Sequence, residues 1–500
     1  MKSLGTESFP RLKNALAVAA LVTASMDLVC AQAARPSSKV DNWIVEHATP
    51  VRSIDAADAD FSDLQPLVDA IGAATVVQLG EPSHGAGSAF AAKVRLIKFL
   101  HERMGFDVLA WESGLYDVSL TQARMRAGEN GVTAAQAGIL LVWSATEEAK
   151  PLFDYVRASQ STTRPLQLAG FDSQMNGACA SDSLAADLRA FVATLRDQGI
   201  LEHANQLVER IIAAHQHLYA RTQQQRRVEL DSVTTAVSGK APAQSPSEVM
   251  SAWEKSDAAK LTGRKEDMES LDQAVDGLLS MISAQRAAFL QVHSTRSITF
   301  VERVIENLRG NDHNVFDSER PDRPTADAAA SALVNQDWNR RDALNAQNLK
   351  WLVESGYPRQ KIIVWAHNAH VMNAYYAADL NGIQTEPQAG GLKPSGVTLR
   401  KWLGKKLYTI VMTSYEGEDG WNSANPIAPA PQGSLEWQLY QLGKPYVFLD
   451  LHSSDAPHPI RIRLDKYRED TLTDGGQAFD AVFYIDRMAP ATRIRSSHPQ

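Results

Sequence analysis

The sequence contains very little cysteine: its 500 residues include only Cys30 and Cys179. Cys30 falls in an N-terminal segment that we expect to be removed, so one cysteine remains and no intramolecular disulfide can form. The fold must therefore be held together by its hydrophobic core alone. Cys179 has no motif around it that marks a nucleophile, and a lone cysteine usually serves as a small apolar side chain, so we expect it to be inert.

Long hydrophobic runs are also missing. The apolar run ALAVAALVTA at residues 15–24 is shorter than the roughly 20 residues that a membrane-spanning helix needs. Positive residues precede this run and the small residues AQA follow it, which is the layout of a secretory signal peptide. The residues DLVC before and at Cys30 lack the small residue expected before a lipidated cysteine. We predict that residues 1–33 are a signal peptide and that the mature protein is periplasmic or secreted, with no membrane span.

No stripe of positive charge runs along the chain. Charged residues make up 22% of the sequence and the formal net charge is −8. This mild acidity argues against nucleic acid as a partner and leaves a small molecule as the expected one. Nothing in the sequence indicates the oligomeric state.

Two catalytic signatures are absent. The Gly-x-Ser-x-Gly elbow of α/β serine hydrolases does not occur, and Ser83 directly precedes His84, so an ordinary turn would point the two side chains apart. The His-Glu-x-x-His helix of metalloproteases is missing as well. A covalent serine mechanism is therefore disfavoured.

Short apolar runs alternate with longer amphipathic ones, which predicts an α/β fold with a mainly parallel central sheet. Several runs are apolar on both faces, so helices should cover both sides of the sheet. The predicted strands are residues 74–80, 107–112, 166–170, 361–366, 407–412, 446–450 and 481–485.

Residues 181–310 show helical periodicity instead, with one polar break. We predict a helical insertion there, inside an α/β catalytic domain made of residues 34–180 and 311–500. The insertion contains His215, His217 and His293, for which we expect structural roles only. A deep cleft is expected where the strands end.

Polar side chains follow four of the predicted strands at their carboxyl ends. Glu81 and His84 follow the first, Glu112 ends the second, Asp172 follows the third, and His367, Asn368 and His370 follow the fourth. Because ligands of open α/β sheets bind at the carboxyl ends of the strands, we expect these side chains to line one cleft.

This set of residues allows two kinds of hydrolysis. A histidine can take a proton from water while a nearby carboxylate orients its ring and stabilises its charged form. Alternatively, His367 and His370, with Glu81, His84 and Glu112, could supply ligands to a metal ion. The spacing of these residues matches no diagnostic metal motif, so we predict no metal and no cofactor.

Several motifs, in order from about residue 70 to about residue 490, resemble the erythromycin esterase family. The resemblance is carried by GEPSHG (80–85), AAKVRLIKFLHERMGF (91–106), WESG (111–114), GFDSQ (170–174), NRRDALNAQNLKWL (339–352) and WAHNAHV (365–371), and more loosely by GSLE (433–436) and FLDL (448–451). It implies an α/β fold with a helical side domain, and hydrolysis of an ester in a macrolide ring by activated water.

The resemblance also implies roles for single residues. His84 is similar to the general base, Glu81 to the acid that orients it, Glu112 to a second acidic residue of the site, and His367 to a later essential histidine. We expect Lys93, Asp172, Asn368 and His370 to contact substrate. Arg341 and Asp342 match an Arg-Asp pair that we interpret as anchoring a helix.

Two positions depart from the family. Pro82 stands where a less constrained residue is usual, and Lys93 occupies a position that is often Arg, whose bidentate grip a lysine cannot make. The sequence therefore predicts an exported ester or lactone hydrolase without naming its substrate. A metal-dependent hydrolase and a non-catalytic carbohydrate- or lipid-related binding protein remain as alternatives.

Overall fold

The computed structural model describes residues 41–175, 177–238, 265–319, 328–376, 383–384, 391–421, 424–452, 456–457, 460–467, 471–473 and 475–494. The predicted signal peptide lies outside the described residues. No helix in the part of the chain described here is long and apolar enough to cross a membrane.

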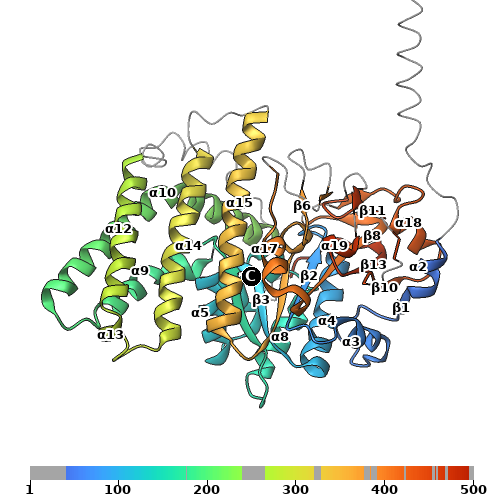
Figure 1. Cartoon of the computed structure of the whole chain (residues 1–500), viewed down its shortest axis with the longest axis horizontal. Helices are drawn as coiled ribbons and strands as arrows, with labels where there is room; N and C mark the ends of the chain where they lie inside the picture. The colour runs from blue at the N-terminus through green and yellow to red at the C-terminus, as the bar shows by residue number, and fades with distance from the viewer. Residues whose placement is uncertain are drawn as a thin grey trace, which may run out of the picture.

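A nine-stranded sheet crosses the centre of the described molecule (Figure 1). Its strands are β1 (Thr49–Val51), β2 (Val76–Glu81), β3 (Phe106–Gly114), β4 (Gln167–Asp172), β5 (Lys361–His367), β8 (Leu407–Asp419), β9 (Asn425–Ile427), β10 (Tyr446–Asp450) and β13 (Ala481–Met488). Two small hairpins lie apart from it, β6 (Tyr375–Tyr376) with β7 (Ile383–Gln384) and β11 (Ile460–Ile462) with β12 (Thr471–Thr473).

The strand order confirms the predicted α/β fold with a mainly parallel sheet. The order is β1-β10-β13-β8-β2-β5-β3-β4, with β9 paired to β8. The strands from β13 to β4 pair in parallel, whereas β1, β10 and β9 pair antiparallel. All seven predicted strands are present, but the antiparallel direction of β10 was not predictable from an apolar run, which carries no information on direction.

Helices cover both faces of this sheet or pack on the helices that do. They are α2 (Asn42–His47), α3 (Pro66–Ile71), α4 (Gly87–Met104), α5 (Leu115–Arg126), α6 (Gly131–Gly138), α7 (Leu141–Ser144), α8 (Lys150–Ser159), α9 (Ala178–Val192), α10 (Gln198–Ser238), α12 (Lys265–Ala284), α13 (Arg286–Phe289), α14 (Thr295–Glu319), α15 (Ala328–Trp351), α16 (Asn368–Val371), α17 (Ser395–Leu403), α18 (Leu435–Tyr440) and α19 (Gly475–Ala478). Short turns of helix follow residue 61, residue 351 and residue 403, as η1 (Ser62–Leu64), η3 (Leu352–Gly356) and η4 (Gly404–Lys406).

Alternate residues of each central strand enter two different hydrophobic cores. In β5, Ile363 and Trp365 pack with α3, α4 and α8, whereas Ile362, Val364 and Ala366 pack on the opposite face with α14, α15 and α17. This division follows from the period of two along a strand, which points successive side chains to opposite faces. A strand buried on both faces must be apolar throughout, and this is why the runs were recognisable in the sequence.

The segment between β4 and β5 is helical, and its helices α9, α10, α12, α13 and α14 gather on one side of the sheet (Figure 1, left). Helix α9 starts before residue 181 and α14 continues past residue 310, so the helices cross both predicted borders of the insertion. Three histidine–aspartate pairs join them: His215 with Asp312, His217 with Asp267 and His313 with Asp272. The structural roles expected for His215, His217 and His293 agree with these contacts for the first two, and His293 Nε2 lies 3.2 Å from Thr194 Oγ1.

Candidate active site

Glu81 and His84 stand at the carboxyl end of β2, in the middle of the sheet. Glu81 is the last residue of the strand and is fully buried, whereas the His84 side chain is 39% exposed. His84 Nδ1 lies 3.3 Å from Glu81 Oε1. If Nδ1 carries the proton and donates it to the carboxylate, Nε2 is left as an acceptor. No protein group within the described residues bonds to Nε2, so this atom is available to a water molecule.

Glu81 accepts hydrogen bonds from three side chains. Trp143 Nε1 donates to Oε1 over 3.0 Å, and the buried Lys93 ammonium pairs with Oε2. Burial alone would raise the pKa of Glu81, but Lys93 and His84 outweigh it and lower the pKa. Burial also lowers the pKa of Lys93 to about 8, although Glu81 opposes this change. Glu81 is therefore held as a carboxylate beneath the exposed imidazole.

His367 ends β5 beside Glu81, with which it is in register. Its Nδ1 accepts a hydrogen bond from the Ala369 amide over 3.0 Å, and its Nε2 lies 3.0 Å from the Pro82 carbonyl. Burial and the neighbouring His84 lower the pKa of His367 to about 3. Both ring nitrogens are thus occupied by the backbone, and His367 is a neutral side chain that fixes the turn carrying His84.

Glu112 and Asp172, at the ends of β3 and β4, are joined by an arginine from α15. The Arg341 guanidinium donates to Glu112 over 2.9 Å and to Asp172 over 2.5 Å. The other oxygen of Glu112 accepts from the His367 amide over 2.8 Å. Burial would raise the pKa of Glu112, but His370 and Arg341 lower it well below its usual range. Arg341, which we interpreted as a helix anchor, is therefore a central member of this network.

His370 lies between two carboxylates. Its Nδ1 is 2.9 Å from Asp342, its Nε2 is 3.2 Å from Glu112, and its ring stacks on Trp338 with 4.5 Å between centroids. Burial would lower the pKa of His370, but Asp342 and Glu112 outweigh it and raise the pKa to about 10. His370 is therefore a buried imidazolium at neutral pH.

The four residues predicted to contact substrate are all used within the fold. Lys93, Asp172, Asn368 and His370 are each at most 2% exposed. Asn368 donates both of its amide hydrogens to backbone carbonyls, those of Met412 and Leu464. The contacts of these four side chains hold the strand ends and α16 in place around Glu81 and His84.

The site thus forms two connected layers of charge. The deeper layer holds the carboxylates of Glu112, Asp172 and Asp342 against the cations Arg341 and His370, which leaves one negative charge in excess (three against two). The outer layer holds Glu81 against Lys93, with the His84 imidazole above them.

A family model described as erythromycin esterase matches residues 101–488, more than three quarters of the chain. The chain belongs to the erythromycin esterase family. The matched range contains Glu112, Asp172, Arg341, His367 and His370 but begins after Glu81, His84 and Lys93. Glu81, His84 and Lys93 are therefore assigned to the site by their geometry.

Named relatives agree with the family. A Bacillus subtilis (strain 168) protein named YbfO, a candidate hydrolase, is 28% identical over 93% of this chain and 94% of its own length. An Escherichia coli erythromycin esterase type II is 21% identical over 90% of this chain and 98% of its own length. The fold matches that of a histidine-to-asparagine variant of the erythromycin esterase EreC in its open conformation, with a TM-score of 0.57, 17% identity, and coverage of 88% of this chain and 98% of that one. The family and these names support a hydrolase.

Among the described residues, this family member has no group of three or more histidine, cysteine, aspartate or glutamate side chains arranged to hold a metal ion. The contacts of the two histidines are consistent with this. Both ring nitrogens of His367 bond backbone groups, and each ring nitrogen of His370 lies beside a carboxylate. Neither ring offers a nitrogen toward a shared centre.

The sequence did not reveal Trp143 or Trp338 as residues of the site. It also did not reveal that Arg341 lies between Glu112 and Asp172. Trp143 lies edge-on to His84, with ring centroids 5.0 Å apart, as well as bonding Glu81. Both tryptophans lie on helices, and a buried aromatic on a helix is most simply explained by core packing. Only their contacts with polar residues far away in the chain distinguish these two tryptophans from ordinary core residues. A single sequence does not show such contacts.

Proposed function

We propose that this protein is an exported hydrolase that cleaves a carboxylic ester or lactone with a water molecule activated by His84. The observation that supports this most directly is the pairing of a buried, anionic Glu81 with the partly exposed His84. Glu81 fixes the proton on Nδ1, and Nε2 then accepts a proton from water as the water attacks the carbonyl carbon. The names of the relatives make a macrolide lactone one candidate substrate.

Ser83 does not compete for the role of nucleophile in this scheme. Its hydroxyl is turned to its own loop, where it accepts a hydrogen bond from the Gly85 amide over 3.1 Å, and the residue is only 8% exposed. Cys179 is buried, and burial raises the pKa of its thiol, which disfavours the reactive thiolate. Activated water is the simplest nucleophile that remains.

The proposal is tested with a panel of aryl esters, simple lactones and a macrolide. His84→Asn should keep the fold and lower kcat/KM by about 10²–10⁴-fold, the usual contribution of a positioned base. Ser83→Ala is the matched control, since it removes the neighbouring hydroxyl, and it should stay within a few-fold of wild type. Intact-mass measurements during turnover should show no acyl-enzyme.

Other outcomes would assign the protein to one of the alternatives. An acyl adduct lost in Ser83→Ala would establish covalent catalysis, and activity removed by a chelator and restored by zinc would establish a metal enzyme. Binding of a carbohydrate or lipid without turnover of any ester would favour a binding protein. Export is tested separately, by N-terminal sequencing of the protein from its native host, which should begin at Ala34.

A further inference from the structure

A cavity of 660 Å³ lies between α5, α9 and α14, beside the edge strand β4. Its volume is within the range of about 300–1,000 Å³ that is usual for small-molecule sites. One part of the wall is apolar and includes Phe191, Phe300, Val301 and Trp351. This cavity takes no part in the hydrolysis proposed above.

Three arginines gather at one end of this cavity. Arg126 and Arg296 line it, and Arg359 lines an adjoining cavity of 400 Å³ that shares Gln167, Arg296 and Tyr357 with the first. All three arginines are exposed. Among the described residues, none of them forms an ion pair with a carboxylate. Unpaired guanidinium groups in one place attract an anion, and their planar forks suit a carboxylate or phosphate.

The two arginines of the larger cavity are already oriented. The Arg296 guanidinium stacks on the ring of Tyr357, 4.6 Å from its centre, and Arg126 donates to Gln167 Oε1 over 2.9 Å. Arg296 also bonds the Tyr357 hydroxyl, which uses part of its donor capacity, and the guanidinium has further N–H groups that can bind an anion. The acidic side chain of the cavity, Asp187, accepts a hydrogen bond from the Tyr116 hydroxyl over 2.7 Å and so has a partner of its own.

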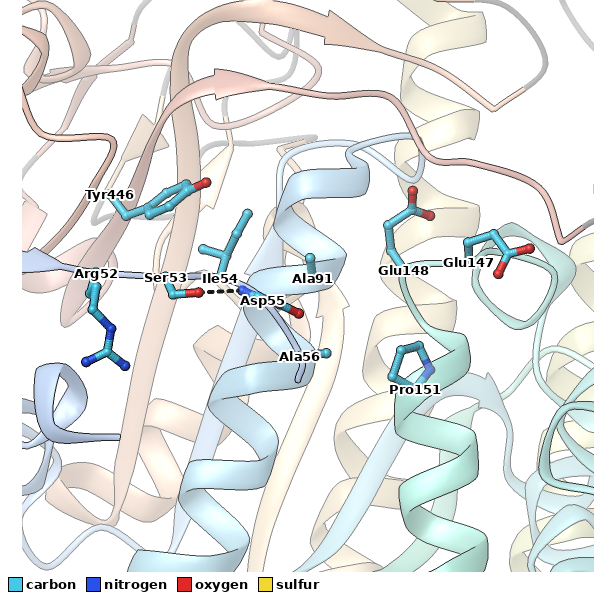
Figure 2. Close-up of a pocket in the computed structure, with 10 residues that line it drawn as sticks. All are labelled: Arg52, Ser53, Ile54, Asp55, Ala56, Ala91, Glu147, Glu148, Pro151 and Tyr446. Atoms are coloured by element: carbon cyan, nitrogen blue, oxygen red, sulfur yellow. Dashed lines mark hydrogen bonds between the residues drawn. The ribbon is translucent and has the colours of Figure 1, made fainter. Parts of the chain in front are cut away.

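A second pocket of the molecule has the opposite character. Figure 2 shows Glu147 and Glu148 side by side on one wall, with Asp55 on the chain segment across from them. Its one cation, Arg52, is paired with Asp58 and Asp60 outside the pocket. An anion is therefore expected at the arginine cavity and not at this one.

We propose that the cavity between α5, α9 and α14 binds a single-chain amphiphile with an anionic head. The head lies among Arg126, Arg296 and Arg359, and the apolar tail enters the chamber formed by Phe191, Phe300, Val301 and Trp351. The cavity shares none of its lining residues with the hydrolytic site. Its arginine end adjoins Gln167 at the start of β4, about 16 Å from Asp172 at roughly 3.3 Å per residue, and its wall continues along β4 to Gly170.

Calorimetric titration of the full chain with decanoate, below its aggregation concentration, tests the proposal. One decanoate should bind per chain, and butyrate and decyltrimethylammonium should each bind at least 10-fold more weakly, because one lacks the tail and the other reverses the charge. Arg126→Gln and Arg296→Gln should each weaken decanoate binding by about 10-fold, the effect of one charge-assisted hydrogen bond. Arg210→Gln, at an exposed arginine of α10 outside the cavity, is the matched control and should leave the affinity unchanged.

Two further variants locate the ligand. Ala190→Trp and Ala123→Trp place a large side chain in the cavity from exposed positions of α9 and α5, so each should abolish binding while the thermal unfolding midpoint stays close to wild type. His84→Asn should leave decanoate binding unaltered. The proposal is overturned if decyltrimethylammonium binds as tightly as decanoate, if both tryptophan variants still bind, or if His84→Asn removes binding, which would place decanoate in the hydrolytic site.

Discussion

Glu81 accepts hydrogen bonds from three donors, and each of them affects His84 differently. His84 itself gains a fixed tautomer, Trp143 holds the same carboxylate oxygen in place, and Lys93 neutralises the charge from below. A carboxylate whose charge is balanced by a buried ammonium stabilises an imidazolium less than an unpaired carboxylate would. Lys93 therefore keeps Glu81 ionised and at the same time limits how strongly it favours protonation of His84.

Replacing Glu81 by Gln should separate orientation from charge. The amide can still accept from His84 Nδ1 but cannot stabilise the charged ring, so kcat should fall on the order of 10²-fold. The Lys93 ammonium would stay buried without its anion, and the free energy of unfolding should fall by about 3–5 kcal/mol. Steady-state kinetics and denaturant unfolding measure the two effects.

The double variant Glu81→Gln, Lys93→Met distinguishes these two effects. It removes the stranded charge, so most of the lost stability should return while kcat stays low. Recovery of kcat together with stability would mean that Glu81 acts only through the fold.

A second prediction at this scale concerns the titration of Lys93. Its pKa is about 8 in the folded protein, below its usual 10.5, because burial disfavours the charged form. Between these two pH values the unfolded chain binds more protons than the folded one, so stability rises with pH by up to about 1.4 kcal/mol per unit. The stability of wild type relative to Lys93→Met should therefore be constant below pH 8 and increase from pH 8 to 10.5. A difference that is flat across this range would contradict the low pKa.

At the scale of elements, α15 and α16 complete a site that four strand ends begin. Helix α15 supplies Arg341 and Asp342, and α16 supplies His370, which pairs with Asp342 on one side and with Glu112 of β3 on the other. His370 thus links a helix to the sheet through its positive charge.

Replacing His370 by Gln tests this link through its dependence on pH. The folded pKa of His370, about 10, lies above its usual 6.5 because Asp342 and Glu112 outweigh the effect of burial. Such a group contributes its full stability below pH 6.5 and loses it as the pH rises through 10. The difference in unfolding free energy between wild type and His370→Gln should be largest at pH 6 and shrink by up to about 1.4 kcal/mol per unit toward pH 10. The same change at the exposed His203 should have a small effect at every pH.

The sequence predicted the strand ends of this site far better than its helices. A doubly buried strand that ends in Glu81, Glu112, Asp172 or His367 is visible in the sequence, because an apolar run changes abruptly to an ionisable residue. The pairing of Arg341 with Asp172 spans 169 positions, and it depends on how α15 packs across the sheet. The sequence of residues 339–352 predicts a helix, but it does not indicate against which strand the helix packs. The sequence therefore predicts a substrate contact for Asp172 and an anchoring role for Arg341, but not the pairing of the two side chains.

At the scale of the whole molecule, one hydrophobic core connects the sheet to the helices on its side. Buried residues of β3, β4 and β5 belong to the same cluster as Leu271, Val275 and Leu278 of α12. In addition, β5 follows the helices in the chain but lies between β2 and β3 in the sheet. The helical segment must therefore be in place for the centre of the sheet to close. We infer that the helices and the sheet unfold together, although a chain of this length often divides into independent units.

Replacing Leu271 by Ala tests this cooperativity at a position remote from the site. Leu271 is fully buried in α12, and the cavity left by truncation should cost about 2–5 kcal/mol. If the core is continuous, loss of helical circular dichroism and loss of hydrolytic activity should move to lower denaturant by the same amount and stay superimposed. Val292→Ala, at a side chain that is 56% exposed between α13 and α14, should move neither curve. If instead the dichroism curve splits and the activity curve keeps its wild-type midpoint, the helices form an independent domain, because the site at the strand ends then survives their unfolding.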